Sequence, residues 1–211
     1  DLHSFPTRRS SDLEPDTLRA EALLASIYRD RGKLDEAASL QAGVIERATQ
    51  AYGPDHPLAI ITATYLAQTY QEQGKLSHAE KILREQAPRA AEAFGPNESY
   101  TLDLNDRLAS VLIARGEFSG ALELLRETLA QRQRGAPDHW RTLNAESLLG
   151  SALAGAGEHE QAERILTRTY ERLTAAAIPA YEARLRSRTV AALATPGSRS
   201  EERRVGKECR S

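Results

Sequence analysis

The side chains that could do chemistry are few and lack the spacing that catalysis or metal binding requires. His56 and His139 occupy equivalent connections just before expected helices, where we expect them to cap a helix or face solvent. His78 and His159 lie near the starts of other expected helices. No cysteine or carboxylate cluster accompanies them at the spacing of metal ligands. We therefore expect no metal site and no cofactor.

The nearest arrangement to a catalytic pair is Asp103 with Asp106, which would share one face of a helix. Paired carboxylates on a solvated helix face are more typical of contacts with a partner than of acid–base catalysis. The sequence has no Gly-Lys-Ser/Thr phosphate loop, no Gly-x-Ser-x-Gly elbow and no His-Glu-x-x-His motif. We therefore expect this sequence not to be an enzyme.

A period of 42 residues sets the positions of these side chains. Glycines recur along the chain at spacings of 42, 42 and 41 residues, and an alanine follows each glycine by five residues. Such a period indicates a repeat array, in which each unit buries its apolar face by stacking on its neighbours. The recurring residues are Gly32, Gly74, Gly116 and Gly157, with Ala37, Ala79, Ala121 and Ala162.

The two ends of the chain stand outside this period. Residues 1–13 and 199–211 both read as the translation of a common sequencing adapter, and we interpret them as artefacts. We therefore expect 14–198 to be a fragment of a longer, cytoplasmic protein, with a truncated native end at 195–198. This body is mildly acidic, which argues against nucleic acid as a partner. No apolar stretch approaches the roughly 20 residues that span a bilayer, so we expect no membrane contact.

Each repeat unit reads as two helices. In the first unit, an apolar stripe at helical spacing runs from Thr17 to Arg31, and a second helix runs from Leu34 to about Tyr52. The next connection contains Asp55, which we expect to cap the following helix. The fold class is therefore all-α. The same pattern predicts helices over 57–73, 77–94, 99–115, 118–134, 140–156, 159–174 and 179–194.

These units resemble the tetratricopeptide repeat family. The run Leu24-Ala25-x-x-Tyr28 and its later copies match the rhythm of that family's first helix, and the recurring glycine and alanine match its turn and second helix. The resemblance implies an α-solenoid, a right-handed superhelix of about four and a half helical hairpins. The repeats are expected near 14–55, 56–97, 98–138 and 139–179, with a half repeat over 180–194 in an array of 14–194.

A period of 42 rather than 34 residues resembles the kinesin light chain type. Among bacterial proteins, the repeats resemble the C-terminal arm of serine/threonine kinases. The resemblance implies a scaffold that binds a peptide or helical segment of a partner protein in a concave groove. One alternative is a regulatory or substrate-recruiting arm of a larger bacterial enzyme, such as a serine/threonine kinase. Another is self-association through the truncated C-terminal end.

In this family the first helix of each hairpin lines the groove. The polar residues that the resemblance carries over to the groove are Arg19, Ser26, Arg29, Gln68, Gln71, Asp103, Asp106, Ser110, Asn144, Ser147 and Ser151.

Overall fold

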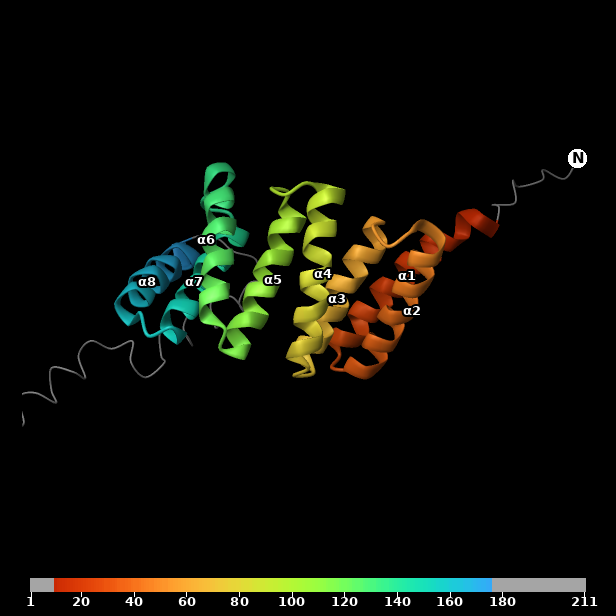
Figure 1. Cartoon of the computed structure of the whole chain (residues 1–211), viewed down its shortest axis with the longest axis horizontal. Coiled ribbons are helices and arrows are strands. Elements are labelled where there is room, and N and C mark those ends of the chain that lie inside the picture. Colours follow the sequence, from red (N-terminus) through yellow and green to blue (C-terminus); the bar gives the residue numbers. More distant parts are fainter. Residues whose placement is uncertain (1–9, 176–211) are drawn as a thin grey trace, which may run out of the picture. The chain divides into compact units, whose positions relative to one another are not determined.

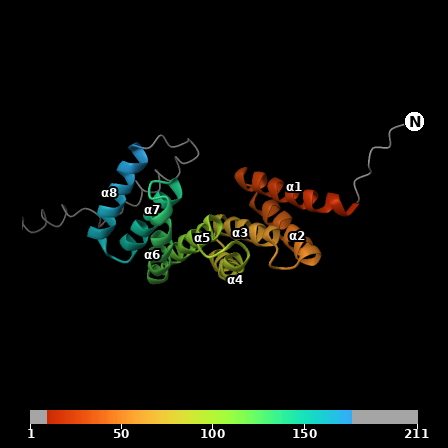
Figure 2. The same ribbon diagram turned by 90° about the horizontal axis from the view of Figure 1, so that it is seen from above.

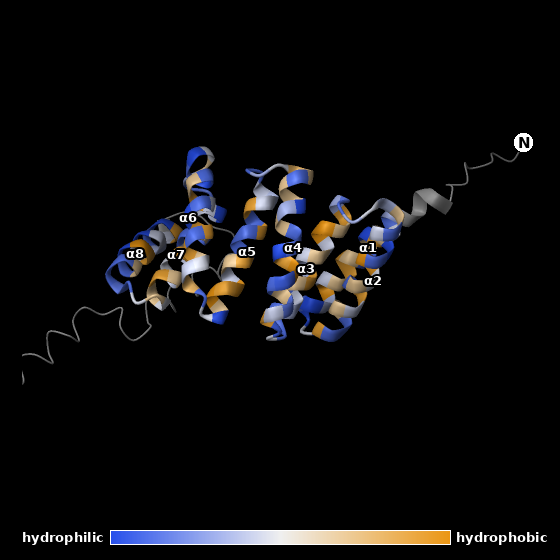
Figure 3. Cartoon of the chain, in the orientation of Figure 1, coloured by the Kyte–Doolittle hydropathy of each residue, from blue (hydrophilic) through white to orange (hydrophobic). Residues whose placement is uncertain are grey.

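The computed structural model describes residues 10–175, and every regular element in this range is an α-helix (Figure 1). No described helix combines the length and the apolar character that a membrane span needs. Apolar and polar stretches alternate along the helices, as amphipathic packing requires (Figure 3). The eight helices are α1 (Ser10–Asp30), α2 (Leu34–Tyr52), α3 (Pro57–Glu72), α4 (Leu76–Phe94), α5 (Ser99–Arg115), α6 (Phe118–Gly135), α7 (Trp140–Gly155) and α8 (His159–Ala175).

The observed helices confirm the all-α prediction for the described residues. Helices α3 to α8 agree with their predicted ranges to within one residue at each end. Helix α1 differs, because it begins at Ser10 rather than at Thr17 and so includes Pro15. A proline this close to a helix start removes only one bond of the helical ladder. The predicted helix over 179–194 lies outside the described residues.

A glycine ends the first helix of each hairpin because the chain there needs a positive φ. Gly32 and Gly74 have φ angles of 76° and 75°, a region that other residues rarely enter. The following amide then bonds back over the turn, from Lys33 N to Tyr28 O at 2.9 Å and from Lys75 N to Tyr70 O at 2.8 Å. This is the Schellman arrangement, and it reverses the chain into the second helix.

The chain divides into two compact units between Leu104 and Asn105, inside α5. In unit 1, α1 packs against α2, α2 against α3, and α3 against α4, as the two views in Figures 1 and 2 show. Part of its core joins three helices: Leu18 of α1, Val44 of α2 and Ala59 of α3 are all buried together. Successive hairpins of unit 1 therefore bury their apolar faces on one another.

In unit 2, α6 packs against α7, and α7 against α8. Small residues allow a close approach: a Cβ added to Gly150 of α7 would lie 2.5 Å from Cγ of Leu166 in α8. A Cβ on Gly155 would likewise meet the ring of Phe118 in α6 at 2.2 Å. Hairpin α7–α8 is thus packed tightly on itself and on α6.

The connections before α3 and α7 are built alike. His56 and His139 each occupy the N-cap, and their Nδ1 atoms accept from the backbone N–H of Leu58 and Arg141 at 3.2 Å. This confirms the capping role expected for these histidines. The cap predicted at Asp55 is wrong, since His56 fills that position and Asp55 instead lies 3.7 Å from Arg89 of α4.

Candidate functional site

The first helices of unit 1 form a hollow of about 450 Å³ between α1 and α3. Two predicted groove residues, Arg19 and Ser26, line it, while most of its wall is apolar. Arg19 is exposed and lies 3.6 Å from Asp16, and Ser26 Oγ donates to the backbone oxygen of Ala22 at 3.3 Å. The hollow is therefore mainly apolar, with a few polar groups among its lining residues. The other lining residues are Ala22, Leu23, His56, Pro57, Leu58, Ile61, Thr62 and Tyr65.

Beside this hollow, Arg29 is held by both first helices. Its Nη1 donates to Oε1 of Gln68 at 3.2 Å, which brings together two predicted groove residues from α1 and α3. Its Nη2 lies 3.1 Å from Asp30, its Nε 3.8 Å from Glu72, and its guanidinium 5.7 Å from the ring centre of Tyr65. The Arg29 side chain is only 11% exposed, whereas Asp30 is 65% and Glu72 39% exposed. The accessible charge at this point is therefore acidic.

Five further predicted groove residues share the same degree of burial. Gln71 and Asp103 of unit 1 are half-buried, as are Ser110, Asn144 and Ser151 of unit 2. The Oγ of Ser151 donates to the backbone oxygen of Ser147 in its own helix at 2.9 Å.

Two of the predicted groove residues in unit 2 are buried. Ser147 is 0% and Asp106 4% exposed. Asp106 does not face a partner because Arg132 of α6 reaches it, with Nη2 3.0 Å from Oδ2, and both side chains are almost fully enclosed. These two residues are therefore not accessible contacts in this structure, which corrects the prediction for them.

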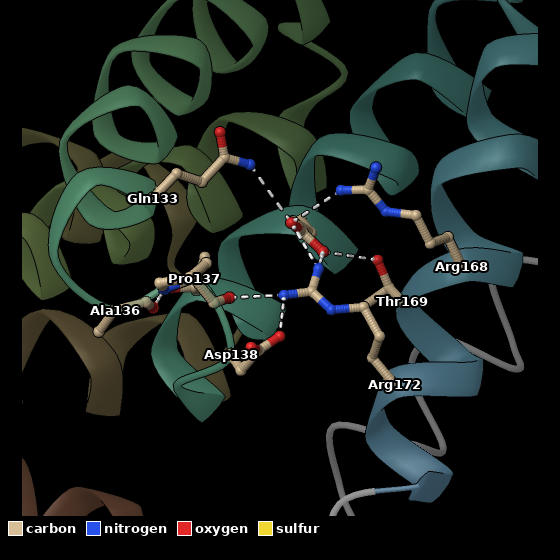
Figure 4. A network of polar contacts seen from close by, with 9 residues as sticks. Gln133, Ala136, Pro137, Asp138, Arg168, Thr169 and Arg172 are labelled. Carbon is tan, nitrogen blue, oxygen red and sulfur yellow. Dashed lines mark hydrogen bonds and ion pairs between the residues drawn. The ribbon is translucent and has the colours of Figure 1, made fainter.

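A larger polar cluster, centred on the buried Glu146 of α7, was not predicted from the sequence (Figure 4). Both carboxylate oxygens of Glu146 accept from Nη1 of Arg172 in α8, at 2.9 and 2.7 Å. Thr169 and Arg168 of α8 add contacts at 3.2 and 3.4 Å, and Gln133 of α6 adds one at 3.3 Å. The Glu146 side chain is 4% exposed. This cluster ties three helices together around an enclosed carboxylate.

Arg172 also binds the connection between α6 and α7. Its Nη2 donates to the oxygen of Pro137 at 2.6 Å and to Oδ1 of Asp138 at 2.9 Å. Partial burial opposes the charge of this guanidinium, but the hydrogen bonds and charges of Asp138 and Glu146 outweigh that effect and raise the pKa of Arg172. Arg172 therefore links α8 both to α7 and to the connection that precedes α7.

Trp140 begins α7 next to this connection. Its ring centre lies 5.7 Å from that of His139, and the guanidinium of Arg141 lies 4.6 Å from it. Among the described residues, no group of three or more histidine, cysteine, aspartate or glutamate side chains could hold a metal ion.

Comparisons with known proteins identify the repeat and its fold. The sequence pattern of the tetratricopeptide repeat matches residues 16–86 and 100–175. No curated protein matches the chain in sequence.

Solved structures share the fold at low sequence identity. The repeats of a Podosopora anserina protein assigned to the kinesin light chains, described as nearly identical TPR-like repeats, align over 93% of this chain and 94% of that one, with 23% identity and a TM-score of 0.71. A single-residue variant of that protein aligns over the same shares, with 21% identity and a TM-score of 0.73. BtubC (BKLC) of P. vanneervenii aligns over 75% of this chain and 63% of that one, with 19% identity and a TM-score of 0.68.

Proposed function

The chain belongs to the tetratricopeptide repeat family, whose fold supports protein–protein interaction, and from this premise we propose that its first helices bind a peptide or helical segment of a partner protein. The observation that carries the proposal is the hollow between α1 and α3. Its volume of about 450 Å³ and its apolar wall suit the side chain of an anchoring residue. We infer that the partner segment places a large apolar side chain there.

The charges beside the hollow favour a basic residue in the same segment. Asp30 and Glu72 are exposed carboxylates, while the guanidinium between them, that of Arg29, is nearly enclosed. A lysine or arginine on the partner would meet these carboxylates at the rim, where such pairs give specificity more than affinity. We propose an apolar anchor flanked by a basic residue as the recognised pattern.

Two adjacent leucines provide a matched test. Leu23 is 65% exposed and lines the hollow, whereas Leu24 is 40% exposed and does not line it. We expect the full chain to select peptides with an apolar anchor and a basic neighbour from a displayed peptide library. Leu23→Asp should weaken the selected peptides at least about tenfold, because a charge in the apolar hollow must lose water, and Leu24→Asp should not.

A library that yields no binding peptide would contradict the proposal. So would peptides that the Leu23→Asp variant binds as well as the unaltered chain. The circular dichroism of both variants should match that of the unaltered chain, because both leucines are exposed.

A regulatory or recruiting arm of a larger bacterial enzyme, such as a serine/threonine kinase, would use the same surface. Gene sequence upstream of Glu14 tests that alternative, since a kinase would show a Gly-rich loop and a His-Arg-Asp motif there. Self-association through the C-terminal end predicts a mass that rises with concentration in light scattering.

A further inference from the structure

A second apolar surface lies on hairpin α1–α2, outside the groove. It includes a shallow hollow of about 650 Å³ lined by α1 and α2 alone, among others by Leu24 and Leu40. On α1, Leu24 and Ile27 are 40% and 42% exposed. We call Leu24, Ile27, Leu40 and Gly43 the end face.

The second and third hairpins bury the two first-helix positions of this face, whereas the positions of Leu40 and Gly43 are half-buried or exposed there. Ile27 corresponds to Thr69, Val111 and Ala152, each 0% exposed. Leu24 corresponds to Leu66, which is 6% exposed. In the second hairpin the covering element is the helix of the preceding hairpin, since Thr69 Oγ1 donates to Oε1 of Gln41 in α2 at 2.9 Å. Leu24 and Ile27 therefore occupy positions that a helix covers in the second hairpin.

In the second hairpin, an arginine of α4 binds the turn that follows the covering helix α2. Arg89 Nη1 donates to the oxygen of Pro54 at 3.3 Å and lies 3.7 Å from Asp55, and these two residues follow α2. Arg172 binds the Pro137–Asp138 turn that follows α6 in the same way.

The first hairpin carries Arg47 at this position. Its guanidinium bonds Glu21 of α1, as that of Arg172 bonds Glu146, and its side chain is 44% exposed against 25% for Arg172. The first hairpin thus combines the apolar end face with a cation, Arg47, at the position that binds the turn after a covering helix in the later hairpins.

We propose that the end face docks an α-helix of a partner protein that ends in a Pro-Asp turn. The apolar side of that helix covers Leu24 and Ile27, and Arg47 donates to the carbonyl and carboxylate of the turn while it keeps its bond to Glu21. A second copy of this chain fits less well at the position that follows α8, because its sequence there reads Ile178-Pro179-Ala180, without a carboxylate. The surface is separate from the groove and goes beyond the proposed function.

A peptide with the sequence of residues 34–57 is the probe, because α2 and its Pro54–Asp55 turn already occupy such a surface within the chain. A hydrocarbon staple between positions 42 and 46, both exposed in α2, removes the cost of folding the isolated helix. Fluorescence anisotropy of the labelled peptide with the full chain should show saturable binding. Ile27→Asp should abolish it.

The charge arm of the test is a double-mutant cycle. Arg47→Gln in the protein and Asp55→Asn in the peptide should each weaken binding about tenfold, and the two together should cost little more than either alone. Arg89→Gln is the matched control, because Arg89 already binds the turn of its own chain. Leu23→Asp should also leave binding unchanged, so failure of the groove and failure of the end face can be told apart.

No saturation up to about 1 mM stapled peptide would overturn the proposal, as would binding that Ile27→Asp retains. Additive effects of Arg47→Gln and Asp55→Asn would overturn the role of Arg47. If light scattering shows a concentration-dependent mass that Ile27→Asp abolishes, the occupant is a second copy and the assignment to a partner protein is wrong.

Discussion

The first and fourth hairpins carry the same acid–arginine pair in different surroundings. Glu21 with Arg47, and Glu146 with Arg172, are each 26 residues apart and join a first helix to a second. The side chains of the first pair are 27% and 44% exposed, whereas those of the second pair are 4% and 25% exposed. The same two residue types are thus half-solvated in one hairpin and largely enclosed in the other.

The difference comes from the neighbouring element rather than from the pair. In the fourth hairpin, Gln133 of α6 and the Pro137–Asp138 turn contribute further hydrogen bonds to the pair. An ion pair in water contributes little, while an enclosed carboxylate that loses its main partner is strongly destabilising. In a repeat protein, the neighbour therefore decides how much a recurring contact matters to stability.

The largest effect should follow from Arg172→Ala. The variant leaves the enclosed carboxylate of Glu146 without its main partner, and removal of one member of a buried pair costs about 3–5 kcal/mol of unfolding free energy. Urea unfolding followed by circular dichroism measures the loss. Arg168→Ala is the control, since Arg168 is 66% exposed and should contribute less than about 1 kcal/mol. Equal effects of the two variants would remove the distinction between the hairpins.

A glycine substitution in each of these two hairpins should change stability by an intermediate amount. Gly150→Ala should destabilise by about 1–3 kcal/mol, because the new methyl group would overlap Leu166. A Cβ added to Gly43 of α2 would meet no atom within 4 Å outside the backbone of its own helix. Gly43→Ala should therefore stabilise by about 0.5–1 kcal/mol through helix propensity. Thermal unfolding of both variants should shift in opposite directions. Shifts of the same sign would mean that the two hairpins are packed equally tightly.

The smallest effect is expected from Arg47→Gln. Its pair with Glu21 is exposed enough that the free energy of unfolding should change by less than about 1 kcal/mol, and by less still in about 1 M salt. Urea unfolding at low and high salt measures this. A loss comparable to that of Arg172→Ala would show that Arg47 is enclosed in solution.

The helices could be predicted because their ends depend on local chemistry. Gly32 and Gly74 mark turns that need a positive φ, and the apolar spacing between such turns sets the lengths. Pro15 shows the limit of this reasoning, since the helix continues through it to Ser10.

The accessibility of the groove residues could not be predicted in the same way. Helical spacing places Asp106 on the polar side of its own helix, but Arg132 from another helix encloses it. A signal was present in the sequence, because an arginine follows Asp106 by 26 residues, as one follows Glu21 and Glu146. Local periodicity does not indicate such a pairing, which depends on how two helices of a hairpin face each other.

Trp140 gives the molecule an optical label for one of its units. It is the only tryptophan in the chain and lies in unit 2, beside His139 and Arg141. Its emission on selective excitation therefore reports the environment of unit 2 alone, whereas far-ultraviolet circular dichroism averages over all the helices. Coincident denaturation curves from the two signals would mean that both units melt as one cooperative block, and separated curves would mean that each melts independently.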